Sequence, residues 1–295
     1  MMKFSFEIRH SFYGVEELMI RMADALKAAL FPPKCLACRS FFNPEAKQGG
    51  RLLENCFQDE PLFVSSKKAI FEGLMAPFLC TACSAEFLPV ESPLCSSCGI
   101  MFKSREGEDH FCGECLGSPK RFNIARAPGI YNHALLEAIH LLKYRGKIQL
   151  AKPLGMLLFC FFIALWDEKS IDAVIPVPLH VKRLKKRGFN QALLLVKDWG
   201  FYAKTFEIEL SHMSVEGHLL ARNRWTKPQT GLDRKKRKAN IKNAFRIREA
   251  EKLNGKRVLL VDDVYTTGAT ADECSKVLLG AGARQVDVLT LARAM

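Results

Sequence analysis

Strand-like and helix-like apolar patterns alternate along the second half of the chain. Three runs rich in valine, isoleucine and leucine have the length of buried strands: DAVIPVP (172–178), KRVLLVDD (256–263) and QVDVLTLAR (285–293). A fourth strand is predicted in RAPGIYNH (126–133), directly before HALLEAIHLLKYRGK (133–147), whose apolar residues recur at helical spacing. This order of elements predicts an α/β fold.

The segment ATADECSKVLLGAGA (269–283) lies between the last two predicted strands and has the features of a helix. Asp272 and Glu273 suit the positive end of a helix dipole, and the closing glycines suit a helix end. Strand, helix and strand at this length predict a parallel βαβ unit. In such sheets ligands bind beyond the carboxyl ends of the strands. Asp262, Asp263 and the TTGAT that follows lie at such an end.

Two further apolar segments bear on membrane association. LGMLLFCFFIALW (154–166) is shorter than the roughly 20 residues that span a bilayer, so we expect a buried helix there. GVEELMIRMADALKAALF (14–31) has the spacing of an amphipathic helix, and charged side chains interrupt it too often for a signal peptide. We therefore expect a cytoplasmic protein with no membrane span.

Composition adds a preference for anionic partners. The 295 residues are 48% hydrophobic and 25% charged, the mix of a globular protein with one large or two modest domains. The formal net charge of +13 favours polyanions such as nucleic acid, a phosphorylated metabolite or an acidic membrane surface. Charge alone does not choose among them.

Eleven cysteines favour metal binding over disulfides in a cytoplasmic chain. Eight of them form four C-x-x-C pairs, and two such pairs supply the four thiolates of a structural zinc site. The alternatives are unconnected core cysteines and a thioredoxin-like redox pair, which accounts for one dithiol and not four. We expect zinc at Cys80, Cys83, Cys95 and Cys98, with the other pairs completing this site or adding a second. The paired cysteines are Cys35, Cys38, Cys80, Cys83, Cys95, Cys98, Cys112 and Cys115, while Cys56, Cys160 and Cys274 are expected to be buried apolar residues.

The chain is predicted to have three parts. Residues 1–34 hold the amphipathic helix, residues 35–118 the cysteine-rich zinc module, and residues 119–295 the α/β domain. Within the module, Asn43 to Lys68 lacks periodicity and is predicted to be an irregular insert. The second boundary falls in the sequence LGSPKRFN, which glycine and proline interrupt.

The stretch VLLVDDVYTTGAT (258–270) predicts a site for a phosphorylated sugar. TTGAT leads into a helix N-terminus, where free backbone N–H groups and the dipole favour an anion. Gly268 permits close approach of a phosphate, and the threonine hydroxyls add donors. The adjacent Asp262 and Asp263 would repel that phosphate, so we expect them to bind vicinal hydroxyls of the same ligand, as in ribose 5-phosphate. The alternative is an aspartate-rich turn without a ligand. Walker A and Rossmann glycine motifs are absent.

These motifs resemble those of a known family. VLLVDDVYTTGAT resembles the phosphoribosyl pyrophosphate (PRPP) signature of type I phosphoribosyltransferases. The C-x-x-C pairs, LKYRGK, IPVPLHVKRLKKRGFNQA and ARNRWTKPQTGLDRKKRKANIKNAF resemble, in the same order, motifs of the ComF/GntX family from about Phe31 to the C-terminus. The resemblance implies a type I phosphoribosyltransferase-like parallel sheet flanked by helices, preceded by a small cysteine-rich zinc module.

The resemblance also implies roles for individual residues. Asp262 and Asp263 would bind the ribose hydroxyls and help to hold Mg²⁺. The basic residues would contact phosphates, and Arg222 and Arg237 would join the two acids as catalytic residues. The implied PRPP-binding residues are Asp262, Asp263, Thr266, Thr267, Gly268, Ala269 and Thr270 at the signature, Arg183, Arg187 and Gly188 near the pyrophosphate, Lys143 and Arg145 in LKYRGK, and Gln229, which lies with Arg222 and Arg237 on a mobile loop.

Three functions remain open from the sequence. The first is a phosphoribosyltransferase that uses PRPP and Mg²⁺, releases pyrophosphate, and serves competence and DNA uptake or nucleotide salvage. Its acceptor is unidentified. The second is a PRPP sensor without catalysis. The third is a nucleic-acid-binding accessory protein of transformation, which would bind single-stranded DNA or the competence machinery. The basic runs KRLKKR (182–187) and RKKRK (234–238) suit either a polyanionic substrate or a nucleic acid.

Overall fold

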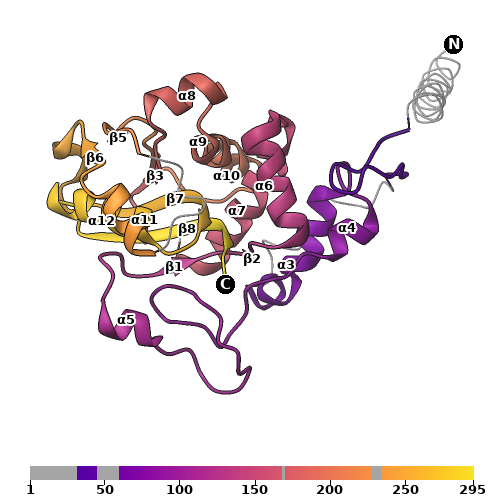
Figure 1. Ribbon diagram of the computed structural model, residues 1–295, viewed down its shortest axis with the longest axis horizontal. Coiled ribbons are helices and arrows are strands. Elements are labelled where there is room, and N and C mark those ends of the chain that lie inside the picture. Colours follow the sequence, from indigo (N-terminus) through magenta and orange to yellow (C-terminus); the bar gives the residue numbers. More distant parts are fainter. Residues whose placement is uncertain (1–31, 45–59, 168–169, 227–233) are drawn as a thin grey trace, which may run out of the picture.

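A computed structural model describes residues 32–44, 60–167, 170–226 and 234–295 (Figure 1). The amphipathic helix predicted for residues 14–31 lies outside the described residues. So do residues 45–59 of the predicted insert, among them Cys56.

The centre of the molecule is a six-stranded sheet in which all pairings are parallel (Figure 1). The order is β1, β8, β7, β3, β4, and β2 also pairs with β8. The strands are β1 (Ala125–Arg126), β2 (Gly129–Ile130), β3 (Ala173–Pro176), β4 (Ser214–Val215), β7 (Arg257–Tyr265) and β8 (Gln285–Arg293). A separate antiparallel pair consists of β5 (Leu220–Arg222) and β6 (Phe245–Ile247). The strands predicted at 172–178, 256–263 and 285–293 are thus confirmed.

The first predicted strand is broken into β1 and β2. Ala127 and Pro128 separate its two halves, and both halves pair with β8. Proline has no backbone N–H and cannot donate to a strand ladder. The carbonyl of Pro128 instead accepts a hydrogen bond from Val90 N at 3.0 Å.

Strand β7 continues past the two acids at which the sequence predicts its end. Asp262, Val264 and Tyr265 remain paired with β8, whereas the pairing with β3 stops at Val261. Pro178 cannot extend the β3 side of the ladder because it lacks a backbone N–H. The backbones of β3 and β7 therefore separate next to Asp262, while β7 stays hydrogen-bonded to β8 on its other edge.

Alternate residues of β7 enter two different hydrophobic layers. Leu259 and Val261 pack with helices α6, α7 and α9, whereas Val258 and Leu260 pack with α12. This alternation is the two-residue period of a strand, and it covers both faces of the sheet as parallel sheets require. Figure 1 shows α7 and α12 on opposite sides of the strands. The helices of the α/β region are α6 (His133–Arg145), α7 (Ala151–Leu165), α8 (Val181–Arg187), α9 (Gln191–Val196), α10 (Trp199–Thr205), α11 (Arg234–Ile241) and α12 (Ala269–Gly280).

Helix α7 is the buried helix that the sequence predicts at 154–166. Leu154, Leu157, Leu158, Phe159 and Phe162 are fully buried. Among the described residues, the stretch of 18 residues that contains α7 is the one helix long and apolar enough to cross a membrane, and 61% of it is buried inside the protein. Its apolar surface is therefore used for packing against the sheet and the neighbouring helices.

Helix α3 (Glu60–Met75) packs against α7 and corrects the predicted extent of the irregular insert. Ile70, Phe71 and Met75 belong to the same hydrophobic layer as α7, and the Phe71 ring stacks on Phe87 at 4.3 Å. The helix begins at Glu60, inside the segment Asn43 to Lys68 that the sequence predicts to be irregular. The shorter helices of this region are α4 (Thr81–Ala85) and α5 (Gly113–Gly117).

Candidate functional site

A cavity of about 960 Å³ lies where β3 and β7 diverge. Its volume suits a small molecule, since ligand pockets commonly span roughly 300–1,000 Å³. Its walls come from α6, α8, the end of β5, the β7–α12 turn and the residues that follow β3. The predicted site residues that line it are Lys143, Arg183, Arg187, Arg222, Asp262, Asp263, Thr266, Gly268, Ala269 and Thr270.

One end of the cavity is the turn between β7 and α12. Gly268 has the left-handed φ of 75° and directly precedes the first residue of α12. A Cβ atom at this position would lie 2.1 Å from Tyr265 Oη, so the turn accepts only glycine. The first backbone N–H groups of α12 have no partner within the helix and favour an anion. This geometry is the one that TTGAT predicts.

Asp272, in the first turn of α12, is paired with an arginine that does not line the cavity. Asp272 accepts two hydrogen bonds from Arg121: the backbone N donates to Oδ1 and Nη1 donates to Oδ2, each at 2.8 Å. Asp272 is not among the residues that line the cavity. The anion-binding end of α12 is therefore not offset by this carboxylate.

Asp263 is buried and already paired. It forms an ion pair with Lys143, and Gln191 donates from Nε2 to its Oδ1 at 3.3 Å. Burial lowers the pKa of Lys143 to about 8, although the charge of Asp262 acts to raise it. Lys143, predicted to contact a phosphate, thus contacts an acid instead. A ligand that binds Asp263 has to share this carboxylate with the lysine or displace it.

Asp262, the neighbouring acid, also lines the cavity. Burial raises its pKa to about 6, against the opposing charges of Lys143, Arg222 and Arg187. Its Oδ1 accepts a hydrogen bond from Asp263 N at 2.8 Å, which fixes the side chain beside the cavity. A carboxylate with this pKa changes charge close to neutral pH.

Three arginines give the cavity an excess of positive charge. Arg183 donates from Nη2 to the Thr226 carbonyl at 2.9 Å, and Arg222 donates to Thr226 Oγ1. Burial lowers the pKa of Arg222 to about 10, with further lowering by the like charge of Arg183. Burial also lowers the pKa of Arg187. Cations that lower one another's pKa are stabilised when an anion binds between them.

Several predicted residues lie elsewhere. Arg145 is exposed, and Gly188 caps the end of α8 with a φ of 85°. Neither lines the cavity. Thr267 Oγ1 accepts from Ala269 N at 3.5 Å, so it supports the turn and does not line the cavity. Gln229 lies outside the described residues, and Arg237 is described only as a backbone position in α11.

The cavity also contains aromatic residues that the sequence motifs do not single out. Tyr131 Oη lies 2.9 Å from His140 Nε2 on α6, and His140 packs edge-on against Tyr144. Arg187 lies over the Tyr144 ring, and Arg183 lies over the Trp225 ring. His140 and Tyr144 are four residues apart and share one face of α6, which is a signal that the helical period contains.

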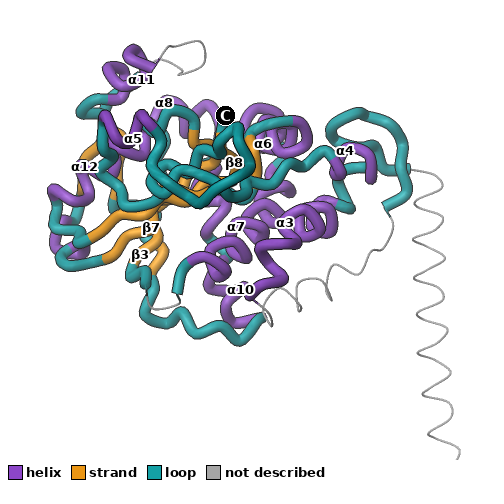
Figure 2. Tube along the Cα trace, turned by 90° about the horizontal axis from the view of Figure 1, so that it is seen from below, coloured by secondary structure: helices purple, strands orange, loops and turns teal. Residues whose placement is uncertain are grey.

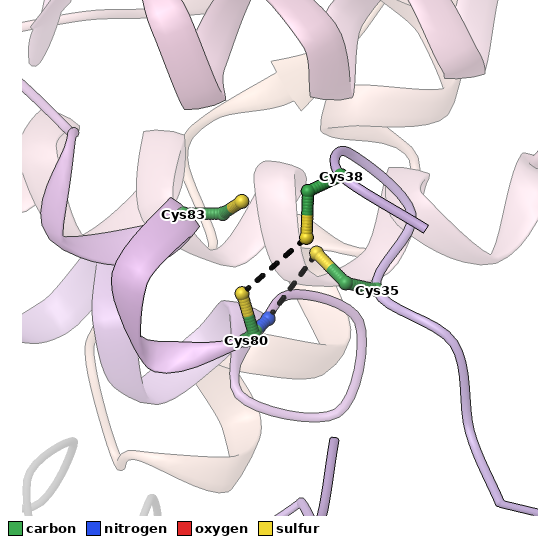
Figure 3. Close-up of side chains that lie close together, drawn as sticks. All are labelled: Cys35, Cys38, Cys80 and Cys83. Carbon is green, nitrogen blue, oxygen red and sulfur yellow. Dashed lines mark hydrogen bonds between the residues drawn. The ribbon is translucent and has the colours of Figure 1, made fainter. Parts of the chain in front are cut away.

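Eight cysteines assemble into two groups of four. Within each group all sulfur atoms lie within 4.8 Å of one another. The first group is Cys35, Cys38, Cys80 and Cys83, whose side chains converge in Figure 3. The second group is Cys95, Cys98, Cys112 and Cys115.

Both groups have the donor set of a structural zinc site. The Cys38 and Cys80 sulfurs are 3.7 Å apart, and the Cys98 and Cys112 sulfurs are 3.8 Å apart. Tetrahedral Zn–S bonds of about 2.3 Å place two sulfurs about 3.8 Å apart. Backbone N–H groups also point at the sulfurs, as at Cys95 Sγ, which accepts from Cys112 N at 3.3 Å. Each group can therefore hold one zinc ion.

The predicted combination of Cys80 and Cys83 with Cys95 and Cys98 is wrong. These two pairs lie in different hydrophobic layers, on opposite faces of the sheet. The chain between them passes β2, where Ile130 N donates to the Leu88 carbonyl at 2.8 Å. Each pair is completed by another pair from its own layer. Cys160 and Cys274, outside the two groups, are buried as predicted.

The chain is similar along most of its length to three curated bacterial proteins. It is 31% identical to competence protein F of Haemophilus influenzae over 234 residues, which cover 74% of this chain and 97% of that protein. It is 30% identical to DNA utilization protein YhgH of Escherichia coli K12, over 74% of this chain and 91% of that protein. Competence protein ComFC of Streptococcus pneumoniae is 30% identical, over 73% of this chain and 87% of that protein.

Other comparisons give weaker likenesses. No family model matches the chain. A solved structure, the glutamine PRPP amidotransferase from B. subtilis complexed with ADP and GMP, is 22% identical with a TM-score of 0.28. The match covers 47% of this chain and 25% of that one.

The fold is the predicted parallel sheet flanked by helices, preceded by cysteine-rich groups that can bind metal. The chain belongs to the ComF family, the family that its motifs resemble.

Proposed function

We propose that the protein is a ComF-type phosphoribosyltransferase that binds PRPP with Mg²⁺ and transfers the phosphoribosyl group to an acceptor, releasing pyrophosphate. One observation carries the proposal: two adjacent aspartates, a glycine turn at a helix N-terminus and three arginines all line a single cavity. These groups match the hydroxyls, the 5-phosphate and the pyrophosphate of PRPP, respectively. We further propose that it acts in the cytoplasm, where eight free thiolates remain available to metal.

The residues divide the chemistry of the transfer. Loss of pyrophosphate leaves positive charge on the ribose ring and negative charge on the leaving group. Arg183, Arg187 and Arg222 would stabilise the leaving group, the main electrostatic requirement of the reaction. Asp262 and Asp263 would accept hydrogen bonds from the ribose hydroxyls and orient the ring. Bound Mg²⁺ would neutralise pyrophosphate oxygens.

Thermal unfolding with PRPP and Mg²⁺ tests the site. A ligand that binds only the folded state stabilises it by about 2.7 kcal/mol at a hundredfold excess over Kd. We expect Asp262→Asn with Asp263→Asn to abolish most of the shift in Tm. Asp198→Asn, at the start of α10 and away from the cavity, should keep it. Equal shifts in the double variant and the wild type would contradict the site assignment.

Turnover needs its own measurement. Pyrophosphate release should be followed with a panel of purines, pyrimidines and other amines as acceptors. Release that depends on one acceptor class and on Asp262 supports the transferase. Tight PRPP binding without release from any acceptor would favour a sensor that uses the same cavity.

A role with nucleic acid is the second candidate. Two of the relatives are named competence proteins and one a DNA utilization protein. Helix α8 also presents exposed lysines outside the cavity, namely Lys182 and Lys185. Both functions can reside in one chain, because these two lysines do not line the cavity that holds the arginines.

A further inference from the structure

Arg293, the last residue of β8, joins the second cysteine group to the β7–α12 turn. Its Nε donates to the Cys98 carbonyl at 3.1 Å, and its Nη1 donates to the Thr266 carbonyl at 2.8 Å. Its guanidinium also lies over the Tyr265 ring, 4.4 Å from the centroid. The side chain is buried, with 6% of the residue exposed. One planar group therefore bridges residues that are far apart in the chain.

Arg293 has no carboxylate among its described hydrogen-bond partners. Its described hydrogen-bond partners are backbone carbonyls and the Cys98 sulfur, which lies 3.8 Å from Nη2, and none of them is a carboxylate. A buried cation is costly unless an opposite charge pairs with it. Four thiolates around one Zn²⁺ carry a net negative charge. The loaded second group thus supplies the counter-charge that this arginine needs.

The other end of Arg293 holds the turn that would bind phosphate. The Thr266 carbonyl belongs to the same turn as Gly268, which directly precedes the first residue of α12. Fixing a carbonyl fixes the peptide plane that follows it. Arginine suits this task because its rigid planar fork presents several donors at fixed directions on separate nitrogen atoms, whereas lysine has one compact ammonium group.

We propose that Arg293 is a positioning residue for the phosphate-binding turn, and that it couples metal binding at the second cysteine group to ribose-phosphate binding in the cavity. The inference rests on the proposed function, since it takes the β7–α12 turn to bind the 5-phosphate. Coupling is reciprocal: a ligand at the turn strengthens metal retention by the same factor by which metal strengthens ligand binding.

The test measures both directions in the full-length, zinc-loaded protein. Ribose 5-phosphate affinity is measured by calorimetry, and zinc release to a coloured chelator is followed with and without ribose 5-phosphate. The Cys38→Ser variant removes an exposed ligand of the first group, so that the remaining release phase reports the second group. With Arg293 unchanged in this Cys38→Ser background, we expect saturating ribose 5-phosphate to slow that phase at least fivefold, the lower end of typical coupling.

Arg293→Gln should lose the effect. We expect its ribose 5-phosphate affinity to fall roughly tenfold, within the usual range of coupling, and its zinc release to become independent of the sugar phosphate. Arg293→Lys keeps the charge but not the fork, and it should fold and retain zinc while binding ribose 5-phosphate at least fivefold more weakly than the wild type. The lysine variant decides the question if the glutamine variant does not fold.

Arg126 provides a matched control. It is another largely buried arginine beside the second group, and it donates from Nη2 to the Ser96 carbonyl at 3.0 Å. No described hydrogen bond joins it to the β7–α12 turn. Arg126→Gln should therefore change zinc retention but leave both ribose 5-phosphate affinity and the protection of zinc by ribose 5-phosphate as in the wild type.

The outcomes separate the two proposals. Wild-type protein that binds neither ribose 5-phosphate nor PRPP contradicts the proposed function itself. Wild-type protein that binds ribose 5-phosphate, together with Arg293 variants that bind it equally well and show the same protection of zinc, overturns the coupling alone. Equal loss of coupling in the Arg126 variant would also overturn it, because charge near the cysteines and not the bridge would then be responsible.

Discussion

Asp262 and Asp263 are adjacent in sequence but have different surroundings. Asp263 pairs with Lys143 and Gln191, whereas burial raises the pKa of Asp262 to about 6. The sequence predicts that both acids face a ligand, and both line the cavity. The partners of Asp263 could not be predicted, because α6 and α9 reach it only through the packing of their layer on the sheet. The sequence thus predicts the chemical role of a single residue, whereas its contacts are known only once the fold is known.

The raised pKa of Asp262 predicts how ligand affinity changes with pH. Below about pH 6 the carboxyl is protonated and loses the charge that favours Mg²⁺, so affinity for PRPP with Mg²⁺ should fall as pH drops through this value. The expected loss is about tenfold per pH unit, the effect of one linked proton. Calorimetry from pH 5 to 8 measures it.

Asp262→Asn provides the control for that titration. Phosphate groups themselves titrate near pH 6, with a second pKa of about 6. The pH dependence of affinity that remains in the variant is the part caused by titration of the ligand phosphates. Identical pH profiles for variant and wild type would mean that Asp262 stays in one protonation state throughout.

At the scale of elements, the sequence predicts best where one pattern extends without interruption. Strand β8 has the predicted bounds, and α12 lies within its predicted segment. The prediction is less accurate where a short segment depends on distant packing, as in the broken pair β1 and β2. The cysteine spacing predicts tetrathiolate chemistry but not the pairing, because spacing along the chain does not tell which face of the sheet each pair reaches.

Helix α8 allows a test of nucleic-acid binding at this scale. Lys182 and Lys185 are exposed and do not line the cavity. If single-stranded DNA binds along α8, changing both lysines to glutamine should reduce the slope of log affinity against log salt by about 0.7 for each DNA phosphate that is no longer neutralised. Fluorescence anisotropy at several salt concentrations measures this slope.

Lys197 and Lys204 serve as the matched pair for that experiment. Both are exposed, at the end of α9 and in α10. Figure 2 shows α8 and α10 on opposite sides of the molecule. Their double glutamine variant removes the same charge and should leave the salt slope unchanged. An equal reduction in both double variants would point to net charge and exclude a DNA track on α8.

At the scale of the whole molecule, the two cysteine groups belong to two layers of one fold. The first packs with α7 and the second with α12, on either side of the sheet. The described part of residues 35–118, predicted to be a zinc module, therefore shares hydrophobic layers with the α/β region. The boundary near residue 118 remains a prediction about the sequence.

The arrangement predicts two zinc ions per chain with separable effects. Cys80→Ser with Cys83→Ser should lower the bound zinc from two equivalents to one, and so should Cys112→Ser with Cys115→Ser, because each double change removes two ligands of one group. Metal analysis of carefully purified protein checks the count. A single equivalent in the wild type, or complete loss in either variant, would contradict two independent sites.

The path of the cysteine-rich chain around β1 and β2 has a consequence for solubility. An open sheet ends in strands whose unpaired backbone groups can recruit a strand from another molecule, and proteins protect such edges. Here Val90 N donates to the Pro128 carbonyl at 3.0 Å, Ile130 N to the Leu88 carbonyl at 2.8 Å, and Ala125 N to the Ser97 carbonyl at 2.7 Å. The opposite edge strand, β4, has only two residues. The segment that connects the two cysteine groups therefore also shields one border of the sheet against aggregation.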